Sequence, residues 1–359
     1  MNRILPNQKY IMKINRSDSP TTSAPGLRRR VILQSALAAA TGAGLGAPAV
    51  LRAQPSAQAP IRITLPSPGS AGSVWQPVIE KFLSPELTRG LNFQWVTADP
   101  GKMQVQLAAG SLDVGVFGTA GLANLVNRGQ DIVLFGPALN NHGRWLVRGD
   151  SPFHKPSDLI GKRIATQPET SETYLQARIA ASLIGIDLKR DVQVIHGPPT
   201  ANLALFERGD VDAVIVLEPT ATRLVAAGAR EIARVGDIWR QATGQTDTPF
   251  LVGLAAQREW VERNRAVASR LARLFAAANQ RLHDEPAIFQ KVHTAIGIRD
   301  DEKAAIALLP KRLPSAYSTR WDRSVWGVID RQVEVALKTG LLTQAPKRSL
   351  YDGVGLEGA

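Results

Sequence analysis

No cysteine occurs among the 359 residues of this chain. Disulfide bonds, thiol nucleophiles, thiolate metal sites and a lipid-modified N-terminal cysteine are therefore excluded. Histidine is scarce too, and none of the five histidines has the H-x-x-x-H spacing of a metal-binding helix. The residues accordingly predict neither a metal nor a cofactor.

Signatures of nucleotide and nucleic-acid binding are missing as well. Gly161-Lys162 follows Pro156, where a phosphate-binding loop needs its first glycine, and no G-x-S-x-G hydrolase turn occurs. The formal charge of +12 depends largely on the N-terminus, because eight of the 43 basic residues and one of the 31 acidic residues precede residue 60. The rest of the chain shows no basic stripe with interleaved aromatics, so nucleic acid is not an expected partner.

The first 59 residues have the pattern of a signal peptide. A basic segment ends in three arginines at 28–30, an uncharged stretch rich in Ala and Gly covers 31–51, and 57–59 has the A-x-A form of a cleavage site. Paired arginines before a weakly hydrophobic stretch indicate the twin-arginine route. A retained membrane anchor is the alternative, but Ala and Gly insert poorly into bilayers. We therefore predict that 1–59 is a twin-arginine-type signal peptide and that the mature protein is periplasmic.

What the mature chain does contain is a pattern that occurs twice. Residues 106–120 read QLAAGSLDVGVFGTA, and residues 205–219 read LFERGDVDAVIVLEP. An offset of 99 residues aligns a glycine in each copy and pairs Asp113 with Asp212. In both copies a helix is expected to end at the glycine, and a buried strand to follow the aspartate. The repetition predicts two similar α/β lobes with a cleft between them.

Strands and helices are expected to alternate along the mature chain, which predicts a largely parallel sheet in each lobe. The expected strands are 61–65, 91–96, 113–117, 132–135, 145–147, a strand ending at 165, 192–195, 212–217 and 250–255. The strand at 145–147 would cross into the second lobe and the strand at 250–255 would return. We therefore expect lobe 1 to comprise 60–145 plus 251–359, and lobe 2 to comprise 146–250.

Four loops that lead from strands into helices are rich in Ser, Thr, Gly and Pro. They are 66–73, 118–121, 167–173 and 217–220. Ligands of such sheets bind outside the carboxyl ends of the strands, and hydroxyl and backbone N–H groups at helix N-termini suit anionic oxygens. Each Ser or Thr taken alone is better explained as an ordinary turn or N-cap residue than as a ligand contact. Together, on a frame that closes by hinge motion, the loops predict a site for a small anionic solute.

Three segments carry a resemblance to a known family. They are LAAGSLDVG at 107–115, KPSDLIGKRIA at 155–165, and RGDVDA at 208–213, followed by Glu218-Pro219. Through them, residues 60 to about 290 resemble the periplasmic substrate-binding proteins of ABC importers in the nitrate/sulfonate/taurine branch. The resemblance implies the α/β fold of type II periplasmic binding proteins, with two Rossmann-like lobes and a ligand cleft. It also implies partners, namely one small solute and a membrane permease with a cytoplasmic ATPase, and a protein that is not an enzyme. A monomer is expected because one chain supplies both sides of the cleft.

The resemblance also implies which residues contact the solute. Carried over by position, the first lobe contributes an anion contact, the second lobe contributes another at a helix N-terminus, and the crossing strand contributes the floor. The implied contacts are Ser67, Ser70, Gly118, Thr119, Ala120, Asn141, His142, Thr170, Ser171 and Glu218. No catalytic residue and no metal ligand is implied.

Charged residues near these loops leave alternatives open. Arg144 pairs either with an acidic group of the solute or with a carboxylate at the surface. Glu218 stands where taurine-binding members have an aromatic residue nearby, and a carboxylate costs an anion pocket affinity unless a donor faces it. Glu-Pro is also a structural feature of the broader family. Glu172, at a helix start, is explained as a surface charge favoured by the helix dipole.

Other functions remain open at this point. A periplasmic sensor that docks on a receptor would have the same cleft as a transport protein. Enzymes that synthesise the thiamine pyrimidine precursor share the frame, but they rely on a cysteine-rich motif and are not exported. A binding protein for that precursor needs stacking aromatics, and few stand near the loops, namely Trp75, Trp145 and Tyr174.

Overall fold

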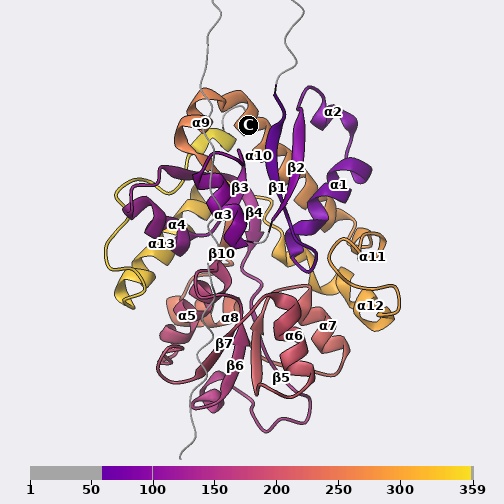
Figure 1. Cartoon of the computed structure of the whole chain (residues 1–359), viewed down its shortest axis with the longest axis vertical. Coiled ribbons are helices and arrows are strands. Elements are labelled where there is room, and N and C mark those ends of the chain that lie inside the picture. The colour runs from indigo at the N-terminus through magenta and orange to yellow at the C-terminus, as the bar shows by residue number, and fades with distance from the viewer. Residues whose placement is uncertain (1–58, 99, 357–359) are drawn as a thin grey trace, which may run out of the picture. The chain divides into compact units, whose positions relative to one another are not determined.

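The computed structural model describes residues 59–98 and 100–356 (Figure 1). Residues 1–58 of the predicted signal peptide lie outside this range, so the export prediction is not addressed by the fold. Within the described residues, no helix has the length and apolar character that a membrane crossing requires.

The described strands form two sheets of five strands, and the first sheet contains both the first and the last of these strands along the chain. Its strands are β1 (Ile61–Pro66), β2 (Phe93–Ala98), β3 (Gly115–Phe117), β4 (Ile132–Asn140) and β10 (Phe250–Gln257). β1 pairs with β2 in parallel, and β10 pairs antiparallel with both β3 and β4. A parallel bridge between Ile63 and Val114 joins the two groups, so the strands follow the order β2-β1-β3-β10-β4.

The second sheet repeats this arrangement. Its strands are β5 (Arg144–Val147), β6 (Arg163–Thr166), β7 (Gln193–His196), β8 (Ala213–Val216) and β9 (Arg230–Arg234), in the order β7-β6-β8-β5-β9. β6 is parallel to β7 and β8, whereas β5 is antiparallel to β8 and β9. In each sheet the antiparallel strand is the one that the sequence predicts to cross between lobes, β10 in one and β5 in the other. The assignment of every segment to a lobe stays a prediction.

The two aspartates of the sequence repeat occupy equivalent places in the two sheets. Asp113 accepts hydrogen bonds from the backbone N–H of Arg62, at 2.7 Å, and from its guanidinium. Asp212 accepts from the backbone N–H of Arg163, at 2.9 Å, and lies 3.8 Å from its Nε. Each aspartate thus satisfies the N–H at the start of the neighbouring parallel strand, which explains why it recurs just before β3 and β8.

Helices surround both sheets (Figure 1). Those near the first sheet are α1 (Trp75–Phe82), α2 (Pro85–Thr88), α3 (Pro100–Ala108), α4 (Thr119–Asn127), α9 (Arg258–Arg263), α10 (Arg265–Asp284), α11 (Ile288–Lys291), α12 (Lys303–Arg312) and α13 (Arg323–Lys338). Those near the second sheet are α5 (Glu172–Leu183), α6 (Pro199–Glu207), α7 (Thr220–Ala226) and α8 (Val235–Thr243). Short 3-10 turns occupy Ala71–Val74, Pro156–Leu159, Pro314–Ala316 and Gly353–Leu356.

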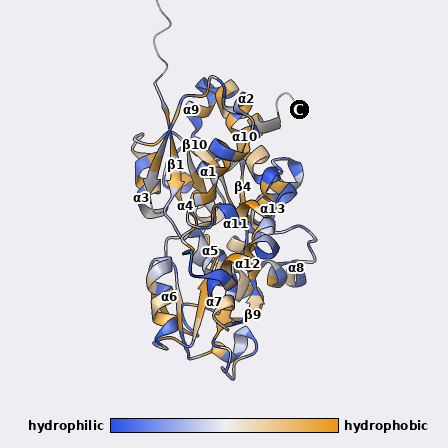
Figure 2. Cartoon of the chain, turned by 90° about the vertical axis from the view of Figure 1, so that its right-hand side faces the viewer, coloured by the Kyte–Doolittle hydropathy of each residue, from blue (hydrophilic) through white to orange (hydrophobic). Residues whose placement is uncertain are grey.

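The longest helix, α10, packs on the first sheet through one apolar face. Leu271, Phe275, Ala278 and Leu282 recur at helical spacing and are buried, and the ring of Phe275 meets Trp75 edge-on at 5.2 Å. In Figure 2 the strands are mainly orange, whereas the helices carry both orange and blue residues. Burying such helix faces against the sheets supplies most of the stability of each helix.

The C-terminal helices α12 and α13 lie beyond residue 290, where the resemblance ends, and α12 contacts a helix near the second sheet. α12 packs against α7, and Glu302 at its N-terminus pairs with Arg223 of α7 at 2.7 Å. α13 packs against α4 and β10. The tail therefore contributes directly to the region in which the candidate site lies.

Candidate functional site

A cavity of about 320 Å³ is formed where loops of both sheets meet. All four loops that the sequence singles out contribute lining residues, among them Pro66, Gly118, Ser171 and Leu217. These loops follow β1, β3, β6 and β8. β1 and β6 hold the same place in the strand order of their sheets, and so do β3 and β8. The cavity therefore lies at the carboxyl ends of the parallel strands, which is the usual ligand position in open α/β sheets.

The predicted contact residues divide into two groups. Those that line the cavity are Ser67, Ser70, Gly118, His142, Ser171 and Glu218. Those that do not are Thr119, Ala120, Asn141 and Thr170. Sequence position identifies the correct loops for both groups, but the direction of each side chain depends on packing that the loops alone do not determine.

Three of the four residues in the second group make hydrogen bonds inside the protein. Thr119 is buried and donates its hydroxyl to Gln332 Oε1 at 2.8 Å, and the Ala120 N–H donates to Glu172. Asn141 accepts from the Gly143 N–H and donates its own N–H to Pro249 O. Thr170 is exposed. The predicted contacts at these four positions are not supported by the geometry.

The Glu172 carboxylate occupies the start of α4, where the resemblance implies a contact with an anionic solute. It accepts from the N–H groups of Ala120 at 3.2 Å and Gly121 at 3.0 Å, at the start of α4, and from Gln176 Nε2 at 2.8 Å. Glu172 also lines the cavity, so the expectation of a surface charge is wrong. Burial raises the pKa of the Glu172 carboxyl, and the N–H donors act in the opposite direction.

A buried network of amides continues from this carboxylate. Gln332 of α13 donates from Nε2 to Gln176 Oε1 at 3.0 Å and to the backbone oxygen of Phe250 at 2.8 Å, and it accepts from Thr119. The side chains of Gln176, Gln332 and Thr119 are at most 2% exposed. α4, α5, β10 and α13 are thereby connected by fully enclosed polar groups, whose loss is costly in a low-dielectric interior.

Gly118 permits the approach of Glu172 to α4. A Cβ at this position would lie 2.0 Å from Glu172 Cγ and 2.3 Å from the backbone oxygen of Leu251. We expect Gly118→Ala to lower the free energy of unfolding by about 2 kcal/mol, because overpacked sites force backbone shifts. Urea unfolding measures the change. Gly327→Ala in the exposed interior of α13, where a Cβ meets nothing within 4 Å, is the matched control and is expected to be neutral or stabilising. A Gly118→Ala protein as stable as the wild type would contradict this account.

Glu218 lines the cavity with both of its oxygens engaged inside the protein. Oε2 accepts from the N–H and the hydroxyl of Thr222, at 2.9 and 2.6 Å, and Oε1 accepts from Arg312 at 2.8 Å. Arg144 Nε lies 3.8 Å from Glu218 and 3.7 Å from Glu231. Arg144 does not line the cavity, so of its two readings the geometry supports pairing with carboxylates, of which Glu218 is buried and Glu231 is partly buried.

His142 and Asn202 each line the cavity, and each has one buried polar atom that no described residue of the chain contacts through a hydrogen bond. His142 Nδ1 lies 2.7 Å from the backbone oxygen of Asn140, and Asn202 Nδ2 donates to the backbone oxygen of Gly197 at 2.9 Å. The unpartnered atoms are His142 Nε2 and Asn202 Oδ1. Burial lowers the pKa of His142 to about 4, against the effect of the Asn140 contact and with the help of the nearby Arg144 charge. Sequence analysis missed Asn202, whose only signal is its place in the first turn of α6 after Pro198-Pro199.

Most of the remaining wall is apolar. Large apolar side chains from both sheets line it, namely Trp75, Met103, Phe117, Leu139, Val216, Leu217, Leu251 and Val252. Of the three aromatics considered near the loops, Trp75 alone lines the cavity, and Phe117 joins it. Within the described part of the chain, no lysine or arginine lines this cavity.

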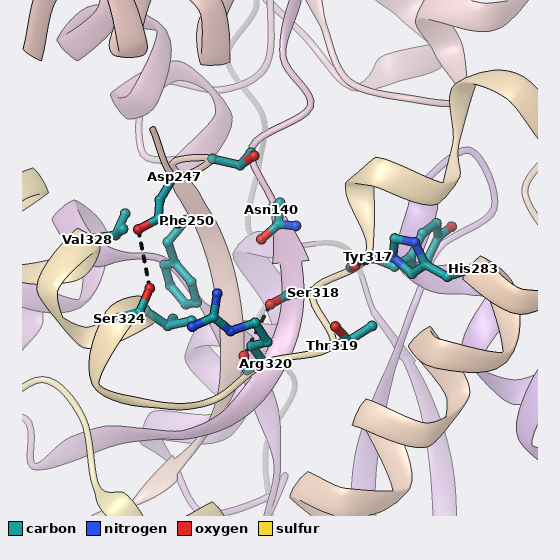
Figure 3. A pocket seen from close by; sticks show the side chains of 12 residues that line it. Asn140, Asp247, Phe250, His283, Tyr317, Ser318, Thr319, Arg320, Ser324 and Val328 are labelled. Carbon is teal, nitrogen blue, oxygen red and sulfur yellow. Dashed lines mark hydrogen bonds between the residues drawn. The ribbon is translucent and has the colours of Figure 1, made fainter. Parts of the chain in front are cut away.

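A second, smaller cavity of about 180 Å³ is shown in Figure 3. Its lining includes Asp247, which accepts a hydrogen bond from Ser324 at 3.2 Å, and the side chains of Phe250 and Arg320. None of its lining residues belongs to the four loops. Among residues 59–98 and 100–356, no group of three or more metal-ligating side chains is placed to hold an ion. The cavity of about 320 Å³ is therefore the candidate site.

Comparisons with known proteins agree with this architecture. The periplasmic aliphatic sulphonate binding protein SsuA of Escherichia coli superposes with a TM-score of 0.64 at 19% identity, over 83% of this chain and 94% of that protein. This likeness shows the fold, which is that of the periplasmic binding proteins. The taurine-binding periplasmic protein of Escherichia coli K12 is 27% identical over 205 residues, which are 56% of this chain. The match spans 61% of the length of that relative.

Several further matches have an enzyme's name. The ATP phosphoribosyltransferase of Nitratidesulfovibrio vulgaris Hildenborough is 33% identical over 135 residues, but these are 35% of this chain and 41% of that enzyme. The matches with the two Escherichia coli binding proteins cover larger shares of this chain, 83% and 56%. A sequence profile described as the NMT1-like family matches residues 97–297, more than half of the chain and the part that supplies most of the cavity wall. The chain belongs to the NMT1-like family.

Proposed function

We propose that this protein is an extracytoplasmic solute-binding protein, which captures a small organic solute in the cavity and delivers it to the permease of an ABC importer. The observation that carries the proposal is the cavity itself, lined by equivalent loops of two equivalent sheets. A solute that contacts the loops of both sheets favours the closed conformation, in which the two sets of loops lie close together. Delivery then requires a partner that favours the open conformation.

The proposed solute has an acidic group, either sulfonate or carboxylate, on an apolar body. Since no lysine or arginine of the described segments lines the cavity, the acid would be met by hydroxyl and backbone N–H groups. Ser70 and Ser171 stand at the N-terminal ends of a 3-10 turn and of α5, and both line the cavity. The apolar wall accounts for the body of the solute. The mature protein would act as a periplasmic monomer.

Thermal unfolding of residues 60–359 against a panel of solutes tests this proposal. The panel contains nitrate, taurine, alkyl and aryl sulfonates, aromatic carboxylates, amino and hydroxy acids, and pyrimidines. A solute that binds only the folded state adds about 2.7 kcal/mol of stability at a hundredfold excess over its dissociation constant. Ser171→Ala is expected to reduce this gain, whereas Thr170→Ala, at the exposed neighbour, serves as the matched control.

The outcomes separate the alternatives. A rise in melting temperature with one class of acid supports the proposal, and a rise with pyrimidines alone favours a pyrimidine-precursor-binding protein. No rise with any compound, together with no solute released from the denatured protein in mass spectrometry, would overturn solute binding. A sensor that docks on a receptor would bind the same solute but would leave its uptake by cells unchanged when the gene is deleted.

A further inference from the structure

We propose that the solute carries, besides its acid, a hydrogen-bond donor such as an amino, amide or hydroxyl group, and that His142 Nε2 and Asn202 Oδ1 accept from it. The inference rests on the proposed function and specifies the chemistry of the same cavity. It assigns a recognition role to two residues at separate places in the fold, since His142 lies between β4 and β5 and Asn202 lies on α6.

The contact of His142 with the backbone defines what its other nitrogen does. A backbone carbonyl oxygen only accepts hydrogen bonds, so the 2.7 Å contact with Asn140 O requires the proton to be on Nδ1. With one proton on the neutral ring, Nε2 has a free lone pair and acts as an acceptor. Burial keeps the ring neutral at physiological pH. His142 is 2% exposed and lines the cavity, with no protein donor for Nε2.

Asn202 also presents a free hydrogen-bond acceptor, and its backbone contact identifies the atom. Its amide nitrogen donates to the backbone oxygen of Gly197 at 2.9 Å, which fixes the orientation of the amide group because the oxygen could not take that place. Oδ1 is therefore the atom left over, and it is an acceptor. Asn202 is fully buried, lines the cavity, and offers Oδ1 no protein donor.

The rest of the wall does not supply these acceptors with donors of their own. Glu172 and Glu218 line the cavity as well, but both carboxylates already accept from groups inside the protein. Among the residues that the structure describes, no ammonium or guanidinium group lines the wall to satisfy a further acceptor. A buried acceptor without a partner is unfavourable, and a solute donor that reaches it relieves that cost.

This arrangement predicts selection against acids that have no donor. A site built to hydrogen-bond an O–H or N–H group discriminates strongly against the analogue that lacks it, because the buried partners are then left unpaired. Plain alkyl sulfonates and unsubstituted aromatic carboxylates would therefore bind weakly. Amino sulfonates, amino or hydroxy carboxylates and their aromatic counterparts would bind better.

Matched pairs of acids, which differ in a single group, test the inference by isothermal titration calorimetry. The pairs are taurine with propanesulfonate, para-aminobenzoate with para-toluate, and para-hydroxybenzoate with para-toluate, so that a methyl group replaces the donor. We expect the donor-bearing member of at least one pair to bind roughly tenfold more tightly to the wild-type protein. His142→Phe and Asn202→Leu, which retain size and remove the acceptor, should each reduce this preference and leave the affinity for the methyl analogue nearly unchanged.

His196→Phe is the control for the histidine substitution. His196 makes a comparable Nδ1 contact, 2.8 Å from the backbone oxygen of Gln167, but it is exposed and does not line the cavity. This variant should retain the preference. A measurement on the wild-type protein guards against variants that fail to fold, since the ¹⁵N resonance of His142 Nε2 should shift when the donor-bearing acid binds and remain nearly unchanged with the methyl analogue.

The results distinguish the inference from the function on which it rests. Equal binding of both members of every pair, or a preference that survives in both variants, overturns the roles of His142 and Asn202 while solute binding stands. If none of these acids binds the folded wild-type protein and the wider panel also gives no shift, the proposed function fails together with the inference.

Discussion

Replacement of Arg312 by methionine is expected to lower the free energy of unfolding by about 3 kcal/mol, the largest effect of a single substitution that we anticipate. Arg312 ends α12, and its guanidinium donates to Glu218 at 2.8 Å, to Thr222 Oγ1 at 2.9 Å and, at very short range, to Glu231. The side chain of Glu218 is fully buried and that of Glu231 is 14% exposed. Removing the guanidinium leaves the negative charges of Glu218 and Glu231 without their main partner in a region with little access to water.

The cost should arise from the uncompensated carboxylates rather than from lost packing. Methionine retains much of the apolar volume of the arginine stem. The double variant Arg312→Met/Glu218→Gln should therefore recover part of the stability, because glutamine removes one buried charge while its oxygen can still accept from Thr222. The coupling between the two substitutions measures the interaction directly.

Urea unfolding followed by tryptophan fluorescence provides the free energies. Arg299→Met is the matched control, since Arg299 pairs with Asp301 at 3.0 Å but the two side chains are 65% and 71% exposed, and a change there should matter little. Equal stability of the Arg312→Met and Arg299→Met proteins would show that Arg144 alone, 3.8 Å from Glu218, compensates the carboxylates.

Local signals in the sequence account for the fold but only for part of the site. Asp113 and Asp212 are predictable because each follows a helix-ending glycine and satisfies the N–H of a strand close by in the same sheet. The four loops follow from the same periodicity. In contrast, Glu172 at the start of α5 pairs with the start of α4, although its two partners lie 52 and 51 positions earlier in the sequence. The two helices lie near different sheets. No local pattern distinguishes this carboxylate from one that a helix dipole holds at the surface.

The same reason explains the roles of Thr119, Glu218 and Asn202. Thr119 turns away from the cavity because Gln332 of α13, 213 residues later, accepts its hydroxyl. Glu218 forms an ion pair with Arg312, which lies beyond residue 290, where the resemblance ends. Asn202 is oriented by the backbone oxygen of Gly197, a contact that depends on the exact path of the loop after β7. Chemistry that depends on distant partners is visible only in the folded chain.

The ionisation of His142 provides the second large effect, and it depends on pH. Burial, which is the main cause, and the Arg144 charge lower the pKa of His142 from 6.5 to about 4, although the contact with Asn140 opposes this. Between these values the unfolded chain binds a proton that the folded protein excludes, so stability increases with pH. The contribution is fully present above pH 6.5 and is lost as the pH falls to about 4. A shift of this size corresponds to about 3 kcal/mol.

The measurement is the pH dependence of unfolding in the wild type and in two variants. Other groups also titrate in acid, so the quantity of interest is the difference between proteins at each pH. His142→Phe should lose about 3 kcal/mol less than the wild type between pH 6.5 and 4, because phenylalanine takes up no proton in either state. His196→Phe, which removes an exposed imidazole, is the control for the substitution itself. Parallel curves for the wild type and His142→Phe would mean that His142 is solvated in the folded state. That result would also undermine its role as a buried acceptor, because a solvated Nε2 has water as a partner and offers a solute donor little advantage.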